Sequence, residues 1–200
     1  SSAIYPHKEA NLEEAQLFKL HTICERLELK KGETLLEIGT GWGALAIYAA
    51  KYYGVKVTTT TISDAQYDYA EQKVKESGLE DSITLLKQDY RTLEGQYDKL
   101  VSIEMIEAVG HEYLSTFFNV CSRHLKPEGK MLIQAITISD QRYDSYRKSV
   151  DFIQRYIFPG GCLPSVSVMA NKVAENTDMV ITSLNDIGLD YAKTLNHWYQ

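Results

Sequence analysis

Cysteine is scarce in this sequence of 200 residues. The three cysteines, Cys24, Cys121 and Cys162, are odd in number and far apart. This pattern predicts buried free thiols in a reducing compartment and argues against a disulfide framework or a metal site. Long apolar runs are missing as well. None approaches the ~20 residues of a membrane-spanning helix, and no signal peptide is recognisable.

Basic residues are in the minority. Lys and Arg number 21 against 27 Asp and Glu, which leaves a net charge of −6. The sequence therefore offers no overall basic face, and we expect no nucleic acid partner. Repeats, low-complexity segments and linkers are missing too. The 44% of apolar residues is enough to form the core of a single domain over residues 1–200.

The most informative stretch runs from Thr34 to Gly43 and reads T-L-L-E-I-G-T-G-W-G. A short apolar run carries one acid, Glu37, and is followed by glycines at alternate positions and by the helix-forming run A-L-A-I-Y-A-A. The pattern predicts a buried strand, a tight turn and the start of a helix. Glycine lets the backbone turn sharply and lets a ligand approach the main chain. Open α/β sheets bind ligands at such turns, at the carboxyl ends of their strands.

Two cofactors compete for this turn. Gly39, Gly41 and Ala44 satisfy the spacing of a dinucleotide site, but that site also uses an acid about 20 residues further on. The corresponding run, Thr58 to Thr61, carries no carboxylate. S-adenosylmethionine, whose loop reads apolar-apolar-acid-apolar-G-x-G-x-G, fits at every position and is favoured. A nicotinamide-dependent oxidoreductase, and a turn that needs its glycines only for packing, are the alternatives.

Strands and helices alternate along the chain. We expect strands at residues 34–38, 55–60, 83–86, 100–103 and 130–136, with helices between them. Asn11 and Ser63 are expected to cap the helices that follow them. The alternation predicts an α/β fold with a parallel sheet, a Rossmann-like three-layer sandwich of the S-adenosylmethionine-dependent methyltransferase type.

The pattern changes after the fifth strand. Residues 140–158 are expected to form one long helix. It has one apolar face, which is either core or a lid over a ligand and is formed by Tyr146, Val150, Ile153 and Ile157. A rigid F-P-G-G-C-L-P-S turn follows. A further strand is expected at residues 179–184 and a further helix from Tyr191.

Six motifs together point to one family. They are L-L-E-I-G-T-G-W-G (35–43), T-I-S-D-A-Q (61–66), Q-D-Y-R (88–91), V-S-I-E-M-I-E-A-V-G (101–110), Y-I-F-P-G-G-C-L-P-S (156–165) and D-Y-A-K-T-L-x-x-W (190–198). The sequence resembles the cyclopropane-fatty-acyl-phospholipid synthase family, with its mycolic acid relatives, over nearly its whole length. The first motif is common to methyltransferases, whereas the fifth is far more specific. Members usually extend well past the final tryptophan, so we expect a catalytic domain that lacks its C-terminal end.

The resemblance implies an activity. The enzyme would transfer the methyl group of S-adenosylmethionine to the double bond of an unsaturated fatty acyl chain of a phospholipid, with cyclopropane formation as the first expectation. The alternatives are a C-methyltransferase that gives a methyl-branched or methylidene chain, a small-molecule methyltransferase, and a lipid-binding protein without chemistry. The presence of Glu107 argues against the last. The enzyme is expected in the cytoplasm, peripheral on the membrane, and it could form a homodimer.

The expected cofactor contacts follow the glycine turn and the ends of the next two strands. Glu37 is expected to brace the loop. The remaining contacts would come from Gly39, Thr40, Gly41, Trp42, Gly43, Thr61, Ile62, Gln66, Asp89, Tyr90 and Arg91.

The family uses a bound bicarbonate as the base that completes the ring. By resemblance, the bicarbonate and the reacting chain would be served by Glu107, Tyr191, Gln134, Ile136 and, near the start of the domain, Ser2. Many members have cysteine in place of Ser2 and histidine in place of Gln134, although both substitutes can donate hydrogen bonds. Glu104 and Glu107, spaced i,i+3, could alternatively begin a solvated helix.

The insert after the fifth strand, at about residues 140–165, is expected to form one wall of a lipid pocket. Its basic residues are close together in sequence and are Arg142, Arg147, Lys148 and Arg155. A local basic cluster can bind anionic lipid. Contact with a membrane surface is therefore expected despite the net charge of −6.

Overall fold

The computed structural model describes residues 1–199. In chain order its elements are α1 (Leu12–Arg26), β1 (Thr34–Ile38), α2 (Ala44–Tyr53), β2 (Lys56–Thr61), α3 (Asp64–Glu76), β3 (Ile83–Lys87), η1 (Tyr90–Thr92), β4 (Tyr97–Ile103), η2 (Ile106–Ala108), η3 (His111–Tyr113), α4 (Leu114–His124), β5 (Leu125–Gln134), α5 (Asp140–Tyr146), α6 (Phe152–Tyr156), α7 (Val166–Asn176) and α8 (Gly188–Tyr199). None of the helices in residues 1–199 combines the length and the apolar composition that crossing a bilayer requires.

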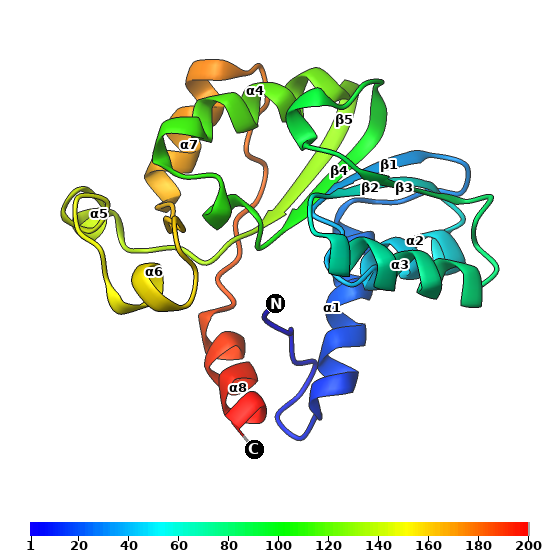
Figure 1. Cartoon of the computed structure of the whole chain (residues 1–200), viewed down its shortest axis with the longest axis horizontal. Coiled ribbons are helices and arrows are strands. Elements are labelled where there is room, and N and C mark those ends of the chain that lie inside the picture. Colours follow the sequence, from blue (N-terminus) through cyan, green and yellow to red (C-terminus); the bar gives the residue numbers. More distant parts are fainter. Residues whose placement is uncertain (200) are drawn as a thin grey trace.

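The strands form a parallel sheet in the order β3-β2-β1-β4-β5. Helices α1, α2 and α3 cover one face of the sheet, and α4 and α7 cover the other (Figure 1). Because all strands run the same way, their carboxyl ends meet at one edge. The predicted three-layer α/β fold is confirmed.

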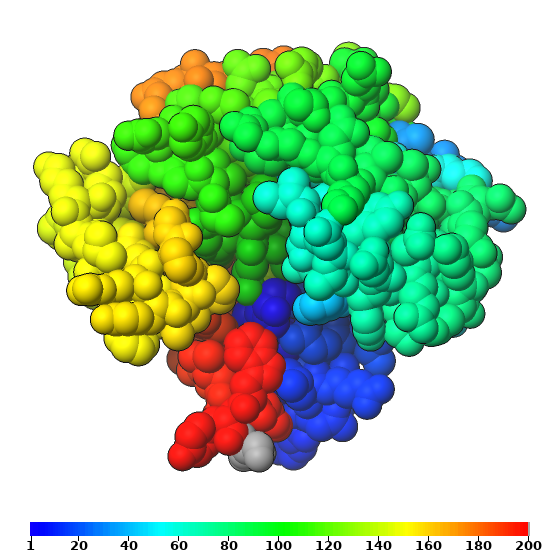
Figure 2. All heavy atoms as spheres, in the orientation of Figure 1, coloured from blue at the N-terminus to red at the C-terminus, as the bar shows by residue number. Residues whose placement is uncertain are grey.

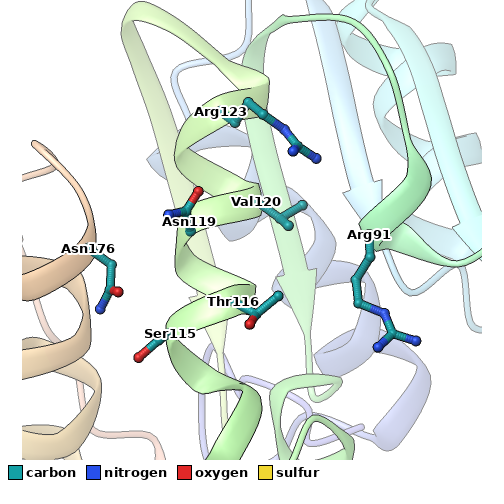
Figure 3. A pocket seen from close by; sticks show the side chains of 7 residues that line it. All are labelled: Arg91, Ser115, Thr116, Asn119, Val120, Arg123 and Asn176. Atoms are coloured by element: carbon teal, nitrogen blue, oxygen red, sulfur yellow. The ribbon is translucent and has the colours of Figure 1, made fainter.

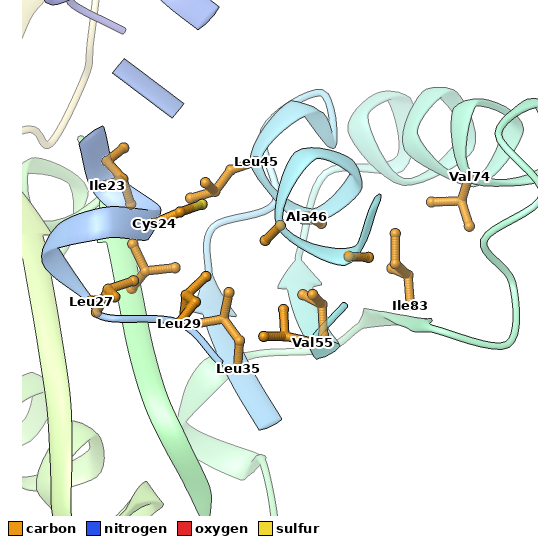
Figure 4. Close-up of a cluster of buried hydrophobic side chains, with 14 residues drawn as sticks. Ile23, Cys24, Leu27, Leu29, Leu35, Leu45, Ala46, Val55, Val74 and Ile83 are labelled. Carbon is orange, nitrogen blue, oxygen red and sulfur yellow. The ribbon is translucent and has the colours of Figure 1, made fainter. Parts of the chain in front are cut away.

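Strand β1 lies at the centre of the sheet, between β2 and β4. Successive side chains of a strand point to opposite faces. Leu35 accordingly joins the buried cluster that includes α1 and α2, which Figure 4 shows, whereas Leu36 joins the cluster that includes α4. Both side chains are 0% exposed. The apolar run that the sequence shows in β1 therefore holds both helical layers against the sheet.

The starts of two helices are fixed as predicted. The Asn11 side chain accepts a hydrogen bond from the Glu14 N–H at 2.9 Å, and the Ser63 hydroxyl accepts one from the Gln66 N–H at 3.3 Å. Helix α2 differs, because it follows Gly43, which has no side chain to cap it. The first N–H groups of α2 are thus left for another partner at the glycine turn.

The segment after β5 departs from the prediction. Instead of one helix over residues 140–158, the structure has the two short helices α5 and α6. The Asp151 carboxylate accepts a hydrogen bond from the Gln154 N–H at 2.8 Å and starts α6 anew. Packing does not bury the apolar face expected there, and the side chains are exposed at Val150, Ile153 and Ile157. The prediction of one continuous helix was wrong, and so was the interpretation of its apolar face as core.

Two further differences lie near the C-terminus. No strand forms at residues 179–184, which have no regular secondary structure. Helix α7, which the sequence did not suggest, follows Ser165, whose hydroxyl accepts a hydrogen bond from the Val168 N–H at 3.3 Å. Val173 of α7 is buried in the cluster that includes α4. The predicted helix around Tyr191 is confirmed as α8.

The first residues of the chain run beside α8. The Ala3 N–H donates to Thr194 Oγ1 at 3.1 Å, and the rings of Tyr5 and His197 stack with their centroids 5.8 Å apart. Ser2 and Ala3 are buried. Figure 1 places the N-terminus close to α8 and to the carboxyl ends of β4 and β5. The N-terminal residues thereby reach the edge of the sheet that holds the glycine turn.

Replacing Phe117 by Ala should destabilise the fold strongly. The Phe117 ring is 0% exposed and packs edge-on against Tyr90 and Phe118. Its loss leaves a cavity, for which we expect a fall of ~3–5 kcal/mol in the free energy of unfolding. Urea unfolding measures the change. The matched control is Phe158→Ala, at an exposed ring, and it should lie within ~0.5 kcal/mol of the parent.

Candidate active site

The glycine turn joins β1 to α2 at the carboxyl edge of the sheet. The φ angles of Gly39, Gly41 and Gly43 are all positive, at 99°, 54° and 86°. A Cβ on Gly39 would lie 3.2 Å from the side chain of Met105, and one on Gly43 would lie 3.2 Å from Ala70, so packing explains these two glycines. A Cβ on Gly41 would meet nothing within 4 Å. The space beside Gly41 is therefore open to a ligand.

A buried acid lies at the end of β1. Glu37 is 3% exposed, and the Thr59 hydroxyl donates to its Oε2 at 2.6 Å. The Thr59 hydroxyl is also 2.7 Å from that of Thr40, in the glycine turn. Burial raises the pKa of Glu37 to about 8, although the Thr59 hydrogen bond acts in the opposite direction. Glu37 is thus tied to the turn through Thr59, as expected of a residue that braces the loop.

Exposed apolar side chains follow β1 and β2 at the carboxyl edge of the sheet. Ile62 and Trp42 have exposed fractions of 78% and 58%. Thr61 itself is buried, and its hydroxyl donates to Gln66 Oε1 at 2.9 Å. Hydroxyl and amide groups, with no carboxylate, therefore stand where a dinucleotide site needs an acid.

The predicted cofactor residues after β3 are Asp89, Tyr90 and Arg91. The Arg91 Nη2 lies 2.6 Å from the Asp89 carboxylate and lowers the pKa of Asp89. Tyr90 packs edge-on against Phe117, with ring centroids 5.7 Å apart. Arg91 also lines a surface cavity of about 360 Å³ next to α4, together with Arg123 of that helix (Figure 3). All three residues follow β3 at the carboxyl edge of the sheet, and Arg91 is engaged by Asp89 and lines this cavity as well.

Glu104 follows β4 directly and has a φ of 49°, which is uncommon for a residue with a side chain. Its Oε1 accepts hydrogen bonds from the Ser2 N–H at 2.7 Å and from the Gln134 Nε2 at 2.8 Å. The Glu104 N–H in turn donates to the Gln134 carbonyl at 2.8 Å. The structure therefore joins Ser2 and Gln134, two predicted site residues, to an acid that the sequence had not assigned to the site.

Glu107 lies one turn further on, in η2. Its Oε1 accepts a hydrogen bond from the Ile136 N–H at 2.5 Å, whereas Oε2 is buried and has no hydrogen-bond partner among residues 1–199. Burial raises the pKa of Glu107, and the charge of Glu104 adds to the rise. The Glu107 carbonyl accepts a hydrogen bond from the Cys162 N–H at 2.8 Å. The F-P-G-G-C-L-P-S segment is therefore fixed to the residue that carries the buried carboxyl group.

Tyr191 of α8 belongs to the same group. Burial raises the pKa of its hydroxyl, and the charges of Glu104 and Glu107 act in the same direction. Figure 2 shows that this face of the molecule is hollowed between the insert (yellow), the chain near residue 60 (cyan) and α8 (red), with N-terminal residues (dark blue) at the bottom. The glycine turn follows β1 and the acids follow β4, so both lie at the carboxyl edge of the parallel sheet.

A family profile for mycolic acid cyclopropane synthetase matches residues 1–200. This chain belongs to the mycolic acid cyclopropane synthetase family. The match covers the glycine turn, the acids after β4, the insert and α8 together. It confirms the family and the fold class that the sequence predicts.

Individual relatives agree with this membership. The cyclopropane-fatty-acyl-phospholipid synthase of Escherichia coli is 43% identical over 100% of this chain and 50% of that protein. The tuberculostearic acid methyltransferase UfaA1 of Mycobacterium tuberculosis is 37% identical over 92% of this chain and 43% of that protein. The crystal structure of mycolic acid cyclopropane synthase CmaA1, complexed with SAH and CTAB, has a TM-score of 0.91 at 31% identity and covers 99% of this chain and 72% of that chain. The chain spans about half the length of the curated relatives it matches.

The residues at the glycine turn fit S-adenosylmethionine. The open space at Gly41 lets a ligand reach the backbone. The exposed apolar side chains of Trp42 and Ile62 suit a nucleoside. Thr61 and Gln66 offer hydroxyl and amide groups but no carboxylate at the end of β2, so the pattern of a nicotinamide site stays incomplete.

Three of the donors expected for a bicarbonate are already engaged by acids of the chain. The Ser2 N–H and the Gln134 side chain both donate to Glu104, and the Ile136 N–H donates to Glu107. A further anion would find these donors occupied and would lie against two carboxyl groups, where like charges repel. The chain itself supplies the acidic groups of this site.

Replacing Glu37 by Gln should change how stability depends on pH. In the unfolded chain Glu37 loses its proton near pH ~4.3, whereas in the folded protein its pKa is about 8. Between these values the folded state binds more protons, so the parent should lose stability as pH rises from ~5 to ~8. Gln cannot ionise, so the variant should lose less stability than the parent over the same pH range.

Urea unfolding at both pH values provides the measurement, with the exposed Glu80→Gln as the control. If the parent and the Glu37 variant keep the same stability difference at both pH values, Glu37 is ionised throughout and does not act as a buried acid.

Proposed function

We propose that the chain is the catalytic domain of an S-adenosylmethionine-dependent enzyme that methylates the double bond of an unsaturated fatty acyl chain of a phospholipid and closes a cyclopropane ring. The observation that carries this proposal is the hydrogen bond of 2.8 Å from the Cys162 N–H to the Glu107 carbonyl. It joins the most family-specific motif of the sequence to the buried carboxyl group. The 43% identity to the Escherichia coli cyclopropane-fatty-acyl-phospholipid synthase supports the same substrate class.

S-adenosylmethionine supplies a methyl group that its sulfonium has already activated. The protein therefore has mainly to position the double bond against this methyl group. Gly41 leaves room for the approach, and Glu37 holds the turn in place through Thr59. The apolar side chains of Trp42 and Ile62 reduce the access of water to the nucleoside side of the cleft.

Methyl addition to a double bond leaves a positive charge on the acyl chain, which must be kept from water. The acids after β4 provide fixed negative charge where this cation develops, and such preorganised charge stabilises it. Ring closure then needs a base that takes a proton from the added carbon. Both the charge and the base have to come from the group formed by Glu104, Glu107 and Tyr191.

Methylation without ring closure is the second candidate. Ser2 and Gln134 stand where many family members have cysteine and histidine, so the surroundings of the base differ from theirs. Two relatives at 37% and 34% identity are named as a tuberculostearic acid methyltransferase and a sphingolipid C9-methyltransferase, not as cyclopropane synthases. Proton NMR of the lipid product separates a ring from a methylidene group, which have the same mass.

The activity is tested by mass spectrometry of phospholipid acyl chains from cells that express the full-length protein. We expect unsaturated chains to gain one CH₂ group. Glu107→Gln should lower turnover by ~10²-fold or more, because it breaks the group of acids from which the charge and the base of the reaction come.

The same variant should keep its affinity for S-adenosylhomocysteine in calorimetry, and NAD should give no binding heat. Unchanged acyl chains with the parent protein, or binding of NAD alone, would reject the proposed activity. If Glu107→Gln weakens S-adenosylhomocysteine binding but keeps the turnover at saturation, Glu107 belongs to the cofactor site.

The proposed place of action is the cytoplasmic surface of a membrane. Exposed apolar side chains gather on and around α6, namely Val150, Phe152, Ile153, Tyr156, Ile157 and Phe158. Basic side chains lie among them. Arg147 is paired with Asp144, whereas Arg155 lies over the Tyr156 ring. In Figure 2 this segment (yellow) borders the hollow, so an acyl chain could pass from a bilayer into the cleft. A homodimer stays a prediction.

Removing apolar side chains from α6 should weaken binding to membranes. The double variant Phe152→Ala/Phe158→Ala removes two exposed rings and should lower the fraction of protein that sediments with anionic phospholipid vesicles. Basic residues contribute about 1 kcal/mol each near an anionic surface, so high salt should lower binding too. Tyr52→Ala, at an exposed aromatic residue of α2, is the matched control. Equal sedimentation with anionic and neutral vesicles contradicts this location.

A further inference from the structure

Glu104 is held in an unusual backbone conformation at the centre of the site. Its φ of 49° lies in the left-handed region, which residues with a side chain seldom adopt. Such conformations persist where surrounding contacts enforce them, and they cluster at functional sites. Glu104 follows β4 at the edge of the sheet where the glycine turn also lies. The strain therefore points to a role for this side chain.

Contacts from distant parts of the chain fix the Glu104 carboxylate. The Ser2 N–H and the Gln134 Nε2 donate to the same oxygen, Oε1, at 2.7 and 2.8 Å. Gln134 Nε2 also lies 3.3 Å from the Ser2 carbonyl, which orients the amide. The other oxygen, Oε2, receives no hydrogen bond from a residue in the range 1–199. One oxygen is thus anchored, and the other keeps its lone pairs for a proton.

The resemblance to the cyclopropane synthase family assigned Ser2 and Gln134 to the binding of a bicarbonate base. In the structure both of these residues bind the Glu104 carboxylate. We propose that the Glu104 carboxylate takes the place of the bicarbonate and is the catalytic base, so that this enzyme needs no bound bicarbonate. The proposal rests on the methyl transfer described under the proposed function.

The atoms of the step balance without a further reactant. The electron pair of the double bond forms the new C–C bond to the methyl group, and the C–S bond breaks to leave S-adenosylhomocysteine and a cation on the acyl chain. Glu104 Oε2 then takes a proton from the added carbon, and the electron pair of that C–H bond closes the ring. The proton leaves to water after the product is released.

Glu104 and Glu107 differ in their hydrogen bonds, and this difference gives them different roles in the proposed step. Glu104 accepts hydrogen bonds from two N–H donors. Glu107 has one donor and a buried oxygen without a partner, and burial raises its pKa. When two neighbouring acids have different surroundings, one is charged and the other keeps its proton. Glu104 is therefore the acid that can accept a proton, and Glu107 the one that holds its own.

Lys19 provides a counter-charge on the side of the N-terminal segment. It is 3% exposed, and its Nζ donates to Ser1 Oγ at 2.6 Å. Burial lowers the pKa of Lys19 to about 8, and the charge of Glu104 opposes this effect. A buried cation therefore lies within electrostatic reach of Glu104.

The test compares the full-length parent protein with Glu104→Gln and Glu104→Gly, in buffer freed of carbon dioxide and in buffer with added bicarbonate. The parent should form its methylated lipid at the same rate in both buffers. Glu104→Gln keeps the size of the side chain but cannot take the proton, so its turnover should fall by ~10²-fold or more.

Glu104→Gly removes the carboxylate and suits the positive φ. Without bicarbonate it should be as slow as Glu104→Gln. Added bicarbonate should raise its rate at least tenfold, because the Ser2 and Gln134 donors become free for the anion. S-adenosylhomocysteine affinity and thermal stability serve as readouts of folding. Glu112→Gln, at an exposed acid of η3, is the matched control.

A parent that slows when carbon dioxide is removed and recovers with bicarbonate overturns the proposal. So does a Glu104→Gln variant that folds, binds S-adenosylhomocysteine and keeps the parent turnover. If the parent forms no methylated lipid in either buffer, the proposed function fails instead, and the proposal about Glu104 fails with it. A normal parent rate with loss of turnover only in the Glu104 variants supports both.

Discussion

The site depends on two half-buried carboxyl groups after β4, those of Glu104 and Glu107, and on the hydrogen bonds that they accept. A buried carboxylate is costly unless hydrogen bonds or a proton satisfy it. The donors come from segments that are far apart in the chain. Ser2 reaches Glu104 from the N-terminal residues, and Gln134 and Ile136 reach the two acids from the end of β5 and the loop after it. The hydrogen bonds to the two acids therefore hold these segments at the site. The insert is attached at the same place, where the Cys162 N–H donates to the Glu107 carbonyl.

An unequal supply of donors then separates the two acids in function. Glu104 has two N–H donors on one oxygen, whereas Glu107 has one donor and an oxygen that nothing in residues 1–199 satisfies. Like charges repel, so the proposed reaction uses only one of the two acids in its charged form. In the proposed reaction the site needs both states, an anion near the developing cation and a neutral acid that does not repel that anion. Hydrogen bonding alone provides this pairing, without an added ion.

The sequence predicted those features that local rules determine. The strand, glycine turn and helix over residues 34–53 follow from an apolar run and glycine spacing, and the caps at Asn11 and Ser63 follow from contacts three residues apart. The predicted core packing of the insert was wrong because helical periodicity does not say whether an apolar face is buried. The apolar face of the insert is exposed at Val150 and Ile153. Glu104 was considered beside Glu107 but was not assigned to the site, because its partners lie 102 and 30 residues away along the chain. Family motifs named Glu107, but no motif encodes a contact with the N-terminal segment.

The exposed insert makes sense once the substrate is a lipid. Each CH₂ group of an acyl chain costs about 0.8 kcal/mol when it is exposed to water, so a chain of many such groups needs a continuous apolar route from the bilayer to the site. One part of the insert is exposed at the surface and another part contacts the site. Its outer part exposes Phe152 and Phe158, and its inner part is held to the site by the Cys162 hydrogen bond and by Tyr143, whose hydroxyl lies 2.6 Å from His111 Nδ1. A core helix across residues 140–158 would have buried the apolar residues that receive the chain under the proposed function. The break between α5 and α6 leaves them facing outward, and the hydrogen bonds at the inner end keep that surface next to the acids.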